Sequence, residues 1–398
     1  MSLMNASGLP EARAAAAASL ALLGCGLLVL ADVLRELARP VKPSLHHSAE
    51  AAPVARAAVR AGAAEPWRSS FAFLGRRLSA HAQTCAYGLS WRAPRVAFAV
   101  DAWTTDDGGT LSLAWPTTSV EDPAGVAVVL PGLGGDARGQ GHAVDACARA
   151  GLACCVFQRR GDGQPLTSPR FNLFGDTRDL DEAVERARRR FGEFLPVVLY
   201  ATSAGTGCLV RYLGERGASA RVAAAFCNSP GYDIAVALTR CGAPYDSHYY
   251  LAGVKRHYLG ANGAMLAARD ADALAACEKA TSLHGFLAAA APFAGAATFG
   301  EYLLRSNPIG TAHDIRVPIL ILNADDDPIC SSKNVDDHIA LFRTHPTAVL
   351  ARMPRGGHCG FYAGRPWRAE PRGHALGARF LAAVLAGDGD DGPECHRR

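Results

Sequence analysis

Residues 196–205 read Pro-Val-Val-Leu-Tyr-Ala-Thr-Ser-Ala-Gly, and they carry the strongest indication of the fold class. A β-type apolar run, Val197–Tyr200, leads into a turn of small residues around Ser203, and a helical stretch follows. This order of strand, turn and helix is typical of a nucleophile elbow, whose usual sequence is Gly-x-Ser-x-Gly. The turn is so tight that the residues two before and two after the serine must be small, as Ala201 and Gly205 are. A serine at an ordinary helix N-cap is the alternative that this motif leaves open.

Seven further apolar runs typical of strands alternate with helical stretches. The strands are expected at Val96–Val100, Leu111–Trp115, Val126–Leu130, Leu152–Phe157, Val222–Phe226, Val317–Leu322 and Ala348–Met353, and the helices from about Asp176, Ser203, Ser332 and His374 onward. This alternation predicts a mostly parallel, eight-stranded sheet with helices on both faces. No helix separates the first two strands, so we expect an antiparallel hairpin that turns at Asp106-Asp107-Gly108-Gly109.

Between about residues 232 and 305 the alternation lapses into helical sequence that is rich in aromatic residues. An insertion at this place is expected to lie over the carboxyl edge of the sheet, where α/β proteins bind their ligands. It would form a helical lid above Ser203. Phe293 and Phe299 are candidates to contact an apolar substrate there, although aromatics at helical spacing mostly pack on the domain beneath.

A glycine-rich loop, Pro131-Gly132-Leu133-Gly134-Gly135, follows the Val126–Leu130 strand. Small residues at the carboxyl end of a strand allow backbone N–H groups to turn inward and bind an oxyanion. The donors expected from this pattern are the N–H groups of Leu133 and of Ala204, the residue after the serine.

An acidic cluster and a histidine follow the last two parallel strands. The first of these strands leads to Asn323-Ala324-Asp325-Asp326-Asp327-Pro328, and the second leads to Gly356-Gly357-His358. Alone, the aspartates would be a solvated turn and the histidine a polar loop residue. Serine, acid and histidine in this order, each at the carboxyl end of a strand, follow the chain order of α/β-hydrolases.

With these motifs the chain resembles the membrane-anchored α/β-hydrolase-domain esterases and lipases related to the plant embryogenesis-associated protein and to bacterial esterases of the same group. The matching stretches extend over about residues 66–386 and are Leu130–Gly135, Val156–Gly161, Pro165–Arg170, Thr177–Leu180, Arg211–Glu215, Asn323–Pro328 and Gly356–His358. The resemblance implies an α/β-hydrolase fold with Ser203 as the nucleophile, Asp327 as the acid and His358 as the base. The chain departs from the family pattern at Gln158, where Asn is usual, at Ala201, where Gly is usual, and at Thr206-Gly207.

The N-terminal segment differs in kind from the rest, because Ala14 to Ala31 carries no charged residue. As a helix it would be about 27 Å long, close to the ~30 Å of a bilayer's hydrocarbon core. An uncleaved single-pass anchor is expected, and a cleaved targeting peptide or an alanine-rich helix are the alternatives. We therefore expect a membrane-associated protein with an anchor at 1–42, a linker at 43–65, an α/β-hydrolase domain at 66–386 with its lid at about 232–305, and a flexible tail at 387–398.

Composition excludes several other classes. With 49% hydrophobic and 20% charged residues, the chain is unlike a disordered, collagenous or coiled-coil protein. Its net charge of +4 comes without a basic run interleaved with aromatics, which argues against a nucleic-acid partner. The 12 cysteines form no Cys-x-x-Cys motif, so buried free thiols are expected rather than a zinc site.

Together these features predict a serine carboxylic-ester hydrolase that acts on lipid esters of acylglycerol or phospholipid type through an acyl-enzyme, without metal or organic cofactor. Medium or long acyl chains are expected to be preferred, because burial stabilises each methylene by ~0.8 kcal/mol. One alternative is a catalytically weak or dead α/β-hydrolase fold that binds a lipid or a partner. Another is an acyltransferase, although the common His-x-x-x-x-Asp motif of that class is absent from the chain.

Overall fold

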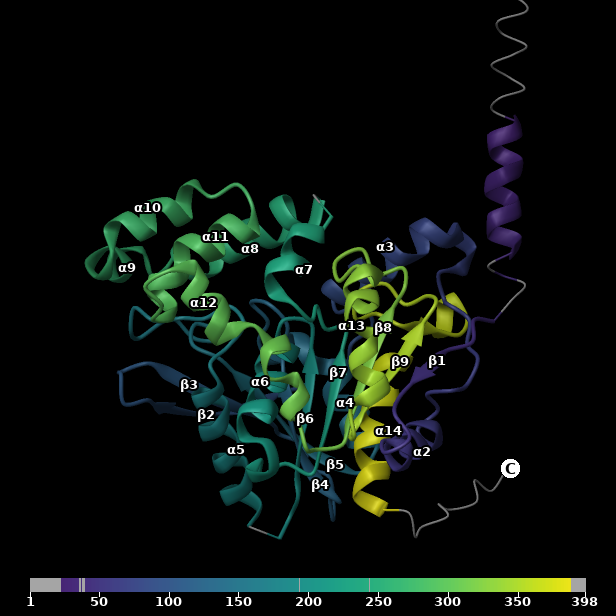
Figure 1. The fold of residues 1–398 in the computed structure, drawn as a ribbon, viewed down its shortest axis with the longest axis horizontal. Coiled ribbons are helices and arrows are strands. Elements are labelled where there is room, and N and C mark those ends of the chain that lie inside the picture. Colours follow the sequence, from purple (N-terminus) through teal and green to yellow (C-terminus); the bar gives the residue numbers. More distant parts are fainter. Residues whose placement is uncertain (1–22, 36, 38–39, 193, 243, 388–398) are drawn as a thin grey trace, which may run out of the picture.

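One large mixed sheet forms the centre of the molecule (Figure 1). The computed structural model describes residues 23–35, 37, 40–192, 194–242 and 244–387. Within them, the strands of the sheet lie in the order β1-β9-β8-β7-β6-β4-β5-β3-β2. They are β1 (Ser44–His46), β2 (Phe98–Thr104), β3 (Thr110–Pro116), β4 (Gly125–Leu130), β5 (Leu152–Gln158), β6 (Val197–Thr202), β7 (Ala224–Asn228), β8 (Ile319–Ala324) and β9 (Ala348–Met353). The strands from β9 to β5 in this order are parallel, whereas β1 and the β2–β3 hairpin pair antiparallel.

The expected α/β-hydrolase fold and its hairpin are confirmed, with one strand more than predicted. Strands β2 to β9 lie where the apolar runs predict them, to within a few residues. After β4 the chain forms β5 on one side of β4 and then β6 on the other side of β4. The strand order therefore reverses between β4 and β6. Ligands of open α/β sheets bind outside the carboxyl ends of the strands at such a point.

Helices cover both faces of the sheet. They are α2 (Ala52–Arg60), α4 (Gly141–Arg149) and α14 (Arg372–Ala386) on one face and α5 (Thr177–Phe191), α6 (Gly205–Arg216) and α13 (Ser332–Thr344) on the other. Successive side chains of a strand point to opposite faces, so in β4 Val126 and Val128 belong to one apolar cluster while Ala127 and Val129 belong to the other. This double burial explains why the central strands β4 to β8 are almost entirely apolar.

The segment 43–65, expected to be a linker, is instead part of the folded core. β1 extends the sheet beyond β9, which gives nine strands rather than the expected eight. α2 buries Val54 and Ala58 in the same apolar cluster as Leu381 of α14. The backbone of Val41 also exchanges two hydrogen bonds with that of Trp67. Sequence reasoning overlooks this segment because α2 is only nine residues long and is buried mostly through alanines, which occur in exposed and buried helices alike.

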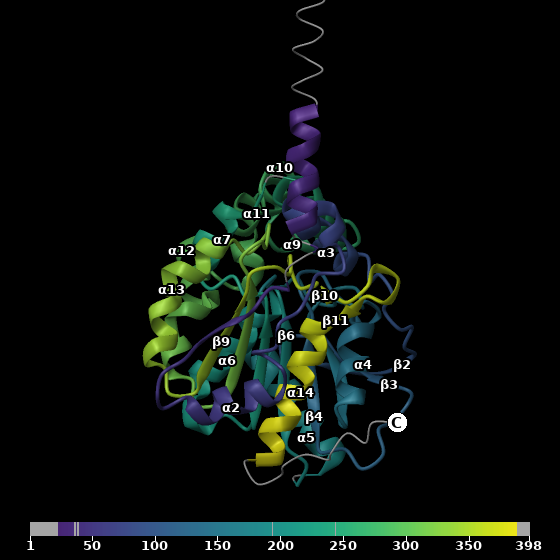
Figure 2. The same cartoon turned by 90° about the vertical axis from the view of Figure 1, so that its right-hand side faces the viewer.

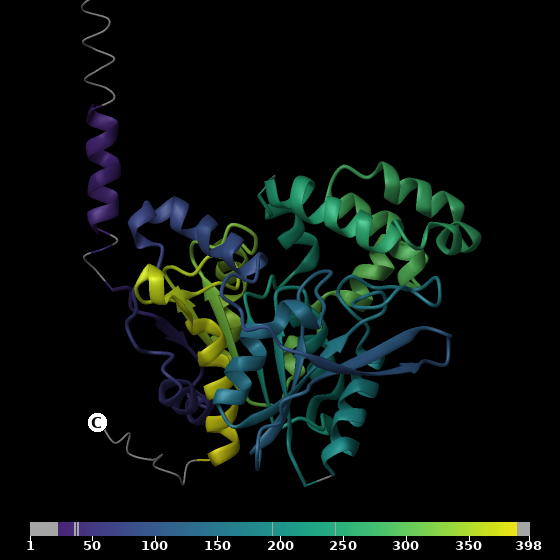
Figure 3. The same ribbon diagram turned by 180° about the vertical axis from the view of Figure 1, so that it is seen from behind.

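The insertion between β7 and β8 is helical, as expected. It contains α7 (Ile234–Arg240), α8 (Leu251–Val254), α9 (Gly263–Arg269), α10 (Ala271–Lys279), α11 (Leu283–Ala290) and α12 (Phe299–Ser306), together with the π-helical turns η4 (Pro244–Tyr250) and η5 (Lys255–Leu259). Figures 1 and 3 show these helices gathered beyond one end of the sheet. A separate apolar cluster holds them together, so the insertion has a core of its own.

Residues 23–35 form a helix that projects from the body of the molecule (Figure 2). Most of its large apolar side chains are exposed, namely Leu23, Leu27, Leu28, Val29, Leu30 and Leu34. Near its end, Asp32 accepts a hydrogen bond of 2.9 Å from the Arg76 N–H at the start of α3 (Gly75–Gly88).

The anchor expected at 1–42 and the tail expected at 387–398 lie partly outside the described residues. Residues 1–22, 36, 38 and 39 of the anchor and residues 388–398 of the tail are not among them. Within the described ranges, no single helix combines the length and the hydropathy needed to cross a membrane. One pair of segments, Leu283–Ala294 and Phe299–Ser306, meets the criteria only when taken together, and the two are bent by 83°.

Candidate active site

Ser203 lies in the sharp turn between β6 and α6. Its φ of 48° is in the left-handed region, which non-glycine residues rarely adopt and which recurs at functional sites. A Cβ on Gly205 would lie only 2.5 Å from the carbonyl oxygen of Pro131, so glycine is required there. Ala201 is fully buried in the sheet, in keeping with the need for a small residue. The turn therefore has the geometry of a nucleophile elbow, with Ser203 in the wall of a cavity.

Ser203, His358 and Asp327 come together at the carboxyl ends of β6, β9 and β8. The Ser203 Oγ lies 2.8 Å from the His358 Nε2, and the His358 Nδ1 lies 2.8 Å from the Asp327 Oδ2. Burial alone would lower the pKa of His358, but the adjacent Asp327 carboxylate outweighs it and holds that pKa well above its ordinary value. A hydroxyl, an imidazole and a carboxylate linked in this order can activate a serine for attack.

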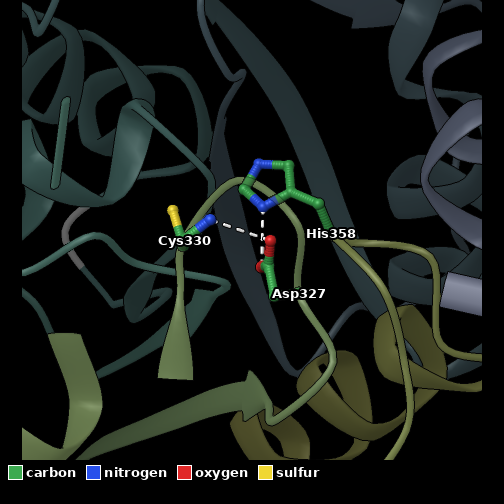
Figure 4. Close-up of side chains that lie close together, drawn as sticks. All are labelled: Asp327, Cys330 and His358. Atoms are coloured by element: carbon green, nitrogen blue, oxygen red, sulfur yellow. Dashed lines mark hydrogen bonds and ion pairs between the residues drawn. The ribbon is translucent and has the colours of Figure 1, made fainter. Parts of the chain in front are cut away.

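The Asp327 carboxylate is held in place from its other side by the turn that follows it. Its Oδ1 accepts hydrogen bonds of 2.8 Å from the backbone N–H groups of Ile329 and Cys330. Figure 4 shows the carboxylate between the Cys330 nitrogen and the imidazole of His358. The carboxylate is thus oriented toward the histidine before any ligand binds.

The two neighbouring aspartates have other partners. Asp326 accepts hydrogen bonds of 2.8 and 2.9 Å from the N–H groups of Gly356 and Gly357, in the loop that carries His358. Burial raises the pKa of Asp326 to about 6. Asp325 forms an ion pair with Arg352. Asp326 therefore supports the histidine loop, while Asp325 stabilises the end of β9.

Two buried hydroxyls that sequence reasoning missed fix the backbone around His358. The His358 N–H donates to the Thr84 Oγ1 of α3 over 2.9 Å, and the Cys359 N–H donates to the Ser229 Oγ over 3.0 Å. Thr84 precedes His358 by 274 residues, so no local pattern links them. Ser229 has a φ of 55°, a backbone feature that the sequence does not indicate.

The glycine-rich loop after β4 lies directly against the elbow. A Cβ on Gly132 would approach the Ser203 Cβ to 3.2 Å. The buried Arg159 guanidinium donates to the Gly132 carbonyl oxygen over 2.6 Å and so positions the loop, a role that its place in a family motif does not reveal. In the described part of the chain, the N–H groups of Leu133 and Ala204 have no hydrogen-bond acceptor, and both residues line the cavity. They are therefore available to bind a ligand oxygen.

The cavity beside Ser203 is apolar. Among the described residues, its walls contain no Asp, Glu, Lys or Arg. The insertion contributes Ile234, Leu238, Tyr250 and Leu283 to these walls. Phe293 and Phe299, which the sequence suggests as substrate contacts, are not in the cavity wall: Phe293 stacks on Phe171 with ring centroids 5.7 Å apart, and Phe299 packs on Tyr302. The expected lid thus contacts the cavity through other side chains.

Cys330 adds a thiol to this region. The potential ligand atoms of Asp327, Cys330 and His358 all lie within 4.8 Å of one another, a grouping that could hold a metal ion (Figure 4). Both ring nitrogens of His358 are already engaged by Ser203 and Asp327, and Cys330 lies in the turn whose backbone N–H donates to the Asp327 Oδ1. That the protein needs no metal or cofactor stays a prediction.

Gln158, which stands where the resembling family usually has Asn, has a structural role. Its Oε1 accepts a hydrogen bond of 3.1 Å from the Ala137 N–H, and its Nε2 donates to the Ser112 Oγ over 3.0 Å. It thereby joins β5 to β3 and to the loop after β4. None of its described hydrogen bonds involves Ser203 or His358.

Comparison with known proteins places these residues in a family. A family model described as "Serine aminopeptidase, S33" matches residues 121–358, which is more than half of the chain and includes Ser203, Asp327 and His358. The chain belongs to this α/β-hydrolase family. The resemblance of the sequence motifs to those of α/β-hydrolases is confirmed, whereas the membrane anchor stays a prediction.

Similarity to individual members of the α/β-hydrolases extends beyond the matched region. The chain is 29% identical to the human protein ABHD15 over 310 residues, which cover 72% of this chain and 63% of that protein. It is 27% identical to the embryogenesis-associated protein EMB8 of Picea glauca over 323 residues, 75% of this chain and 68% of that one. It is 26% identical to the phospholipase ABHD3 of Mus musculus over 289 residues, 68% of both proteins. The chain thus spans less than two thirds of the length of its human relative.

Proposed function

We propose that this protein is a serine carboxylic-ester hydrolase that acts on lipid esters, with Ser203, His358 and Asp327 as its catalytic residues. One observation carries the proposal. The Ser203 Oγ, the His358 imidazole and the Asp327 carboxylate form a continuous chain through two contacts of 2.8 Å, and Ser203 lies in the wall of an apolar cavity.

The reaction proceeds by acyl transfer to Ser203. His358 takes the hydroxyl proton through Nε2, and the serine oxygen attacks the ester carbonyl. The resulting oxyanion accepts hydrogen bonds from the N–H groups of Leu133 and Ala204. The Asp327 carboxylate accepts the hydrogen bond of the His358 Nδ1–H, which fixes the tautomer of the ring, and it stabilises the imidazolium. His358 then gives its proton to the leaving alcohol, and a water molecule hydrolyses the acyl-enzyme by the same route.

Two observations support a lipid ester as substrate. The described residues of the cavity wall include no charged side chain, so the cavity suits a hydrocarbon chain better than a peptide or a sugar. The Mus musculus relative is named a phospholipase. The exposed apolar helix at residues 23–35 supports the further proposal that the N-terminal segment holds the protein on a membrane, where such esters reside.

The specificity constant kcat/KM is expected to rise along a series of glycerol and nitrophenyl esters from acetyl to medium and long acyl chains. Each buried methylene adds ~0.8 kcal/mol, which is about a fourfold gain in kcat/KM. Steady-state rates with the Ser203→Ala protein as the blank measure this trend. A maximum at acetate would refute the lipid proposal and leave a hydrolase of small esters. Transfer of the acyl group to an alcohol in preference to water would support an acyltransferase instead.

Two proteins shortened at the N-terminus distinguish the residues that bind the membrane from those that the fold requires. A protein that begins at Pro40 is expected to keep the melting temperature of the full chain and to lose its flotation with phospholipid vesicles. A protein that begins at Glu65 lacks β1 and the buried face of α2, and it is expected to lose several kcal/mol of stability. Thermal unfolding and vesicle flotation test both statements. Flotation of the Pro40 protein as strong as that of the full chain would contradict the anchor.

A further inference from the structure

The apolar cavity does not end beside Ser203. From the lid residues Tyr250 and Leu283 it continues between the sheet and the helices of one face, past Val210 of α6, and it reaches Ile319, His345 and Ala348. Ile319 and Ala348 are the first residues of β8 and β9, whereas Ser203 directly follows the last residue of β6. The cavity therefore extends from the carboxyl end of the sheet toward its amino end.

The register of the strands gives the depth of this space. Thr202 of β6 pairs with Asn228 of β7, which in turn pairs with Leu322 of β8. Ser203 is thus level with Asn323, four residues above Ile319. At ~3.3 Å per strand residue, the floor lies about 13 Å below Ser203, and the sideways step from β6 to β8 lengthens the path. Half of a bilayer's hydrocarbon core, which one lipid chain spans, is ~15 Å.

The described residues at the floor of the cavity offer no free polar group. The His345 Nε2 lies 3.1 Å from the Ala312 carbonyl oxygen, and its Nδ1 accepts a hydrogen bond of 3.2 Å from the Thr347 N–H. Both nitrogens are therefore occupied by backbone groups, and burial lowers the pKa of this histidine, which keeps the ring neutral. A hydrocarbon terminus can contact this floor without leaving a buried polar atom unpaired.

We propose that this cavity is a tunnel for the acyl chain of the scissile ester, which runs from the carbonyl carbon at Ser203 down to Ile319, His345 and Ala348. This inference rests on the proposed function and adds to it that the acyl group is a single unbranched chain of membrane-lipid length. The acyl chain enters the body of the α/β domain between α6 and the sheet, and the leaving alcohol remains at the mouth beneath the lid. Depth along α6 then sets the longest chain that fits.

Substitutions at two positions on α6 test the depth of the tunnel. At 1.5 Å per helix residue, Gly207 lies ~6 Å and Val210 ~10 Å along the helix from Ser203. A Cβ added to Gly207 would lie 3.7 Å from the nearest atom of Phe174 and 3.9 Å from that of Pro308. The first carbon of a new side chain therefore fits at Gly207 without a clash. Gly207→Leu and Val210→Phe are expected to block the tunnel at these two depths. Val100→Phe on β2, where the side chain is exposed, is the matched control.

The measurement is kcat/KM for nitrophenyl esters from acetate to palmitate, together with calorimetric binding of sodium palmitate. For Val210→Phe the palmitate-to-acetate ratio of kcat/KM is expected to fall more than tenfold, because each excluded methylene costs about fourfold. The longest acyl chain that is hydrolysed efficiently should be shorter for Gly207→Leu than for Val210→Phe. Palmitate binding should weaken in both proteins. Val100→Phe should keep the profile of the unchanged protein.

The outcomes separate the tunnel from the proposed function. Unchanged palmitate-to-acetate ratios in both folded tunnel variants would overturn the tunnel and leave the esterase in place. Palmitate binding that is lost in Val210→Phe, in a protein that hydrolyses no ester, would support the tunnel and overturn the esterase. If Val210→Phe does not fold, Gly207→Leu alone tests the tunnel, because the larger shift of substrate preference toward short acyl chains is expected for it.

Discussion

Ser203→Ala is expected to lower kcat for ester hydrolysis by ~10⁴–10⁶ and to abolish covalent labelling by a fluorophosphonate. The variant removes the attacking oxygen but leaves the oxyanion donors and the cavity, so a small residual rate and substrate binding should persist. Steady-state kinetics and gel-based labelling measure the two effects. Ser219→Ala, at an exposed position outside the cavity, is the control and should behave like the unchanged protein. Full labelling of Ser203→Ala would show that another residue is the nucleophile.

Asp327→Asn is expected to lower kcat by ~10⁴. Asp327 accepts two N–H groups from its own turn, so an amide that keeps those bonds must turn its NH₂ group toward the His358 Nδ1. That contact selects the tautomer with the proton on Nε2, which cannot accept the Ser203 proton. Kinetics with a nitrophenyl ester near neutral pH measure the loss.

The adjacent aspartates provide the matched comparison for Asp327. Asp325→Asn should have a mild effect, because it removes only an ion pair with Arg352. Asp326→Asn should also be milder than Asp327→Asn, since its amide oxygen can still accept from Gly356 and Gly357. A larger loss for Asp325→Asn than for Asp327→Asn would show that the acid has been assigned to the wrong carboxylate.

The strand pattern could be predicted from the sequence because its signals are strong and local. β4 to β9 are mostly apolar runs, and buried parallel strands require apolar residues on both faces. Ser203, Asp327 and His358 follow strand ends, and parallel strands bring their carboxyl ends to one edge of the sheet. Strand order and a short turn thus suffice to predict that these residues meet.

Other features depend on contacts that no local pattern encodes. α2 is buried through alanines, and alanine occurs in exposed and buried helices alike. Thr84 and Arg159 act on the backbone of distant loops, so their roles appear only when the chain is folded. Phe293 is as aromatic as a substrate contact would be, yet it faces the core of the insertion. The tunnel is the space left between α6 and β8, which depends on how side chains from separate elements fit.

The site of covalent modification shows whether Ser203 is the nucleophile. The folded protein is treated with a fluorophosphonate, and the modified peptide is identified by mass spectrometry, with heat-unfolded protein as the control. A single adduct on Ser203 that is absent from the unfolded protein is the result predicted by an elbow serine activated by His358 and Asp327. An adduct on another residue, or none in protein shown to be folded, would contradict the assignment of Ser203 as the nucleophile.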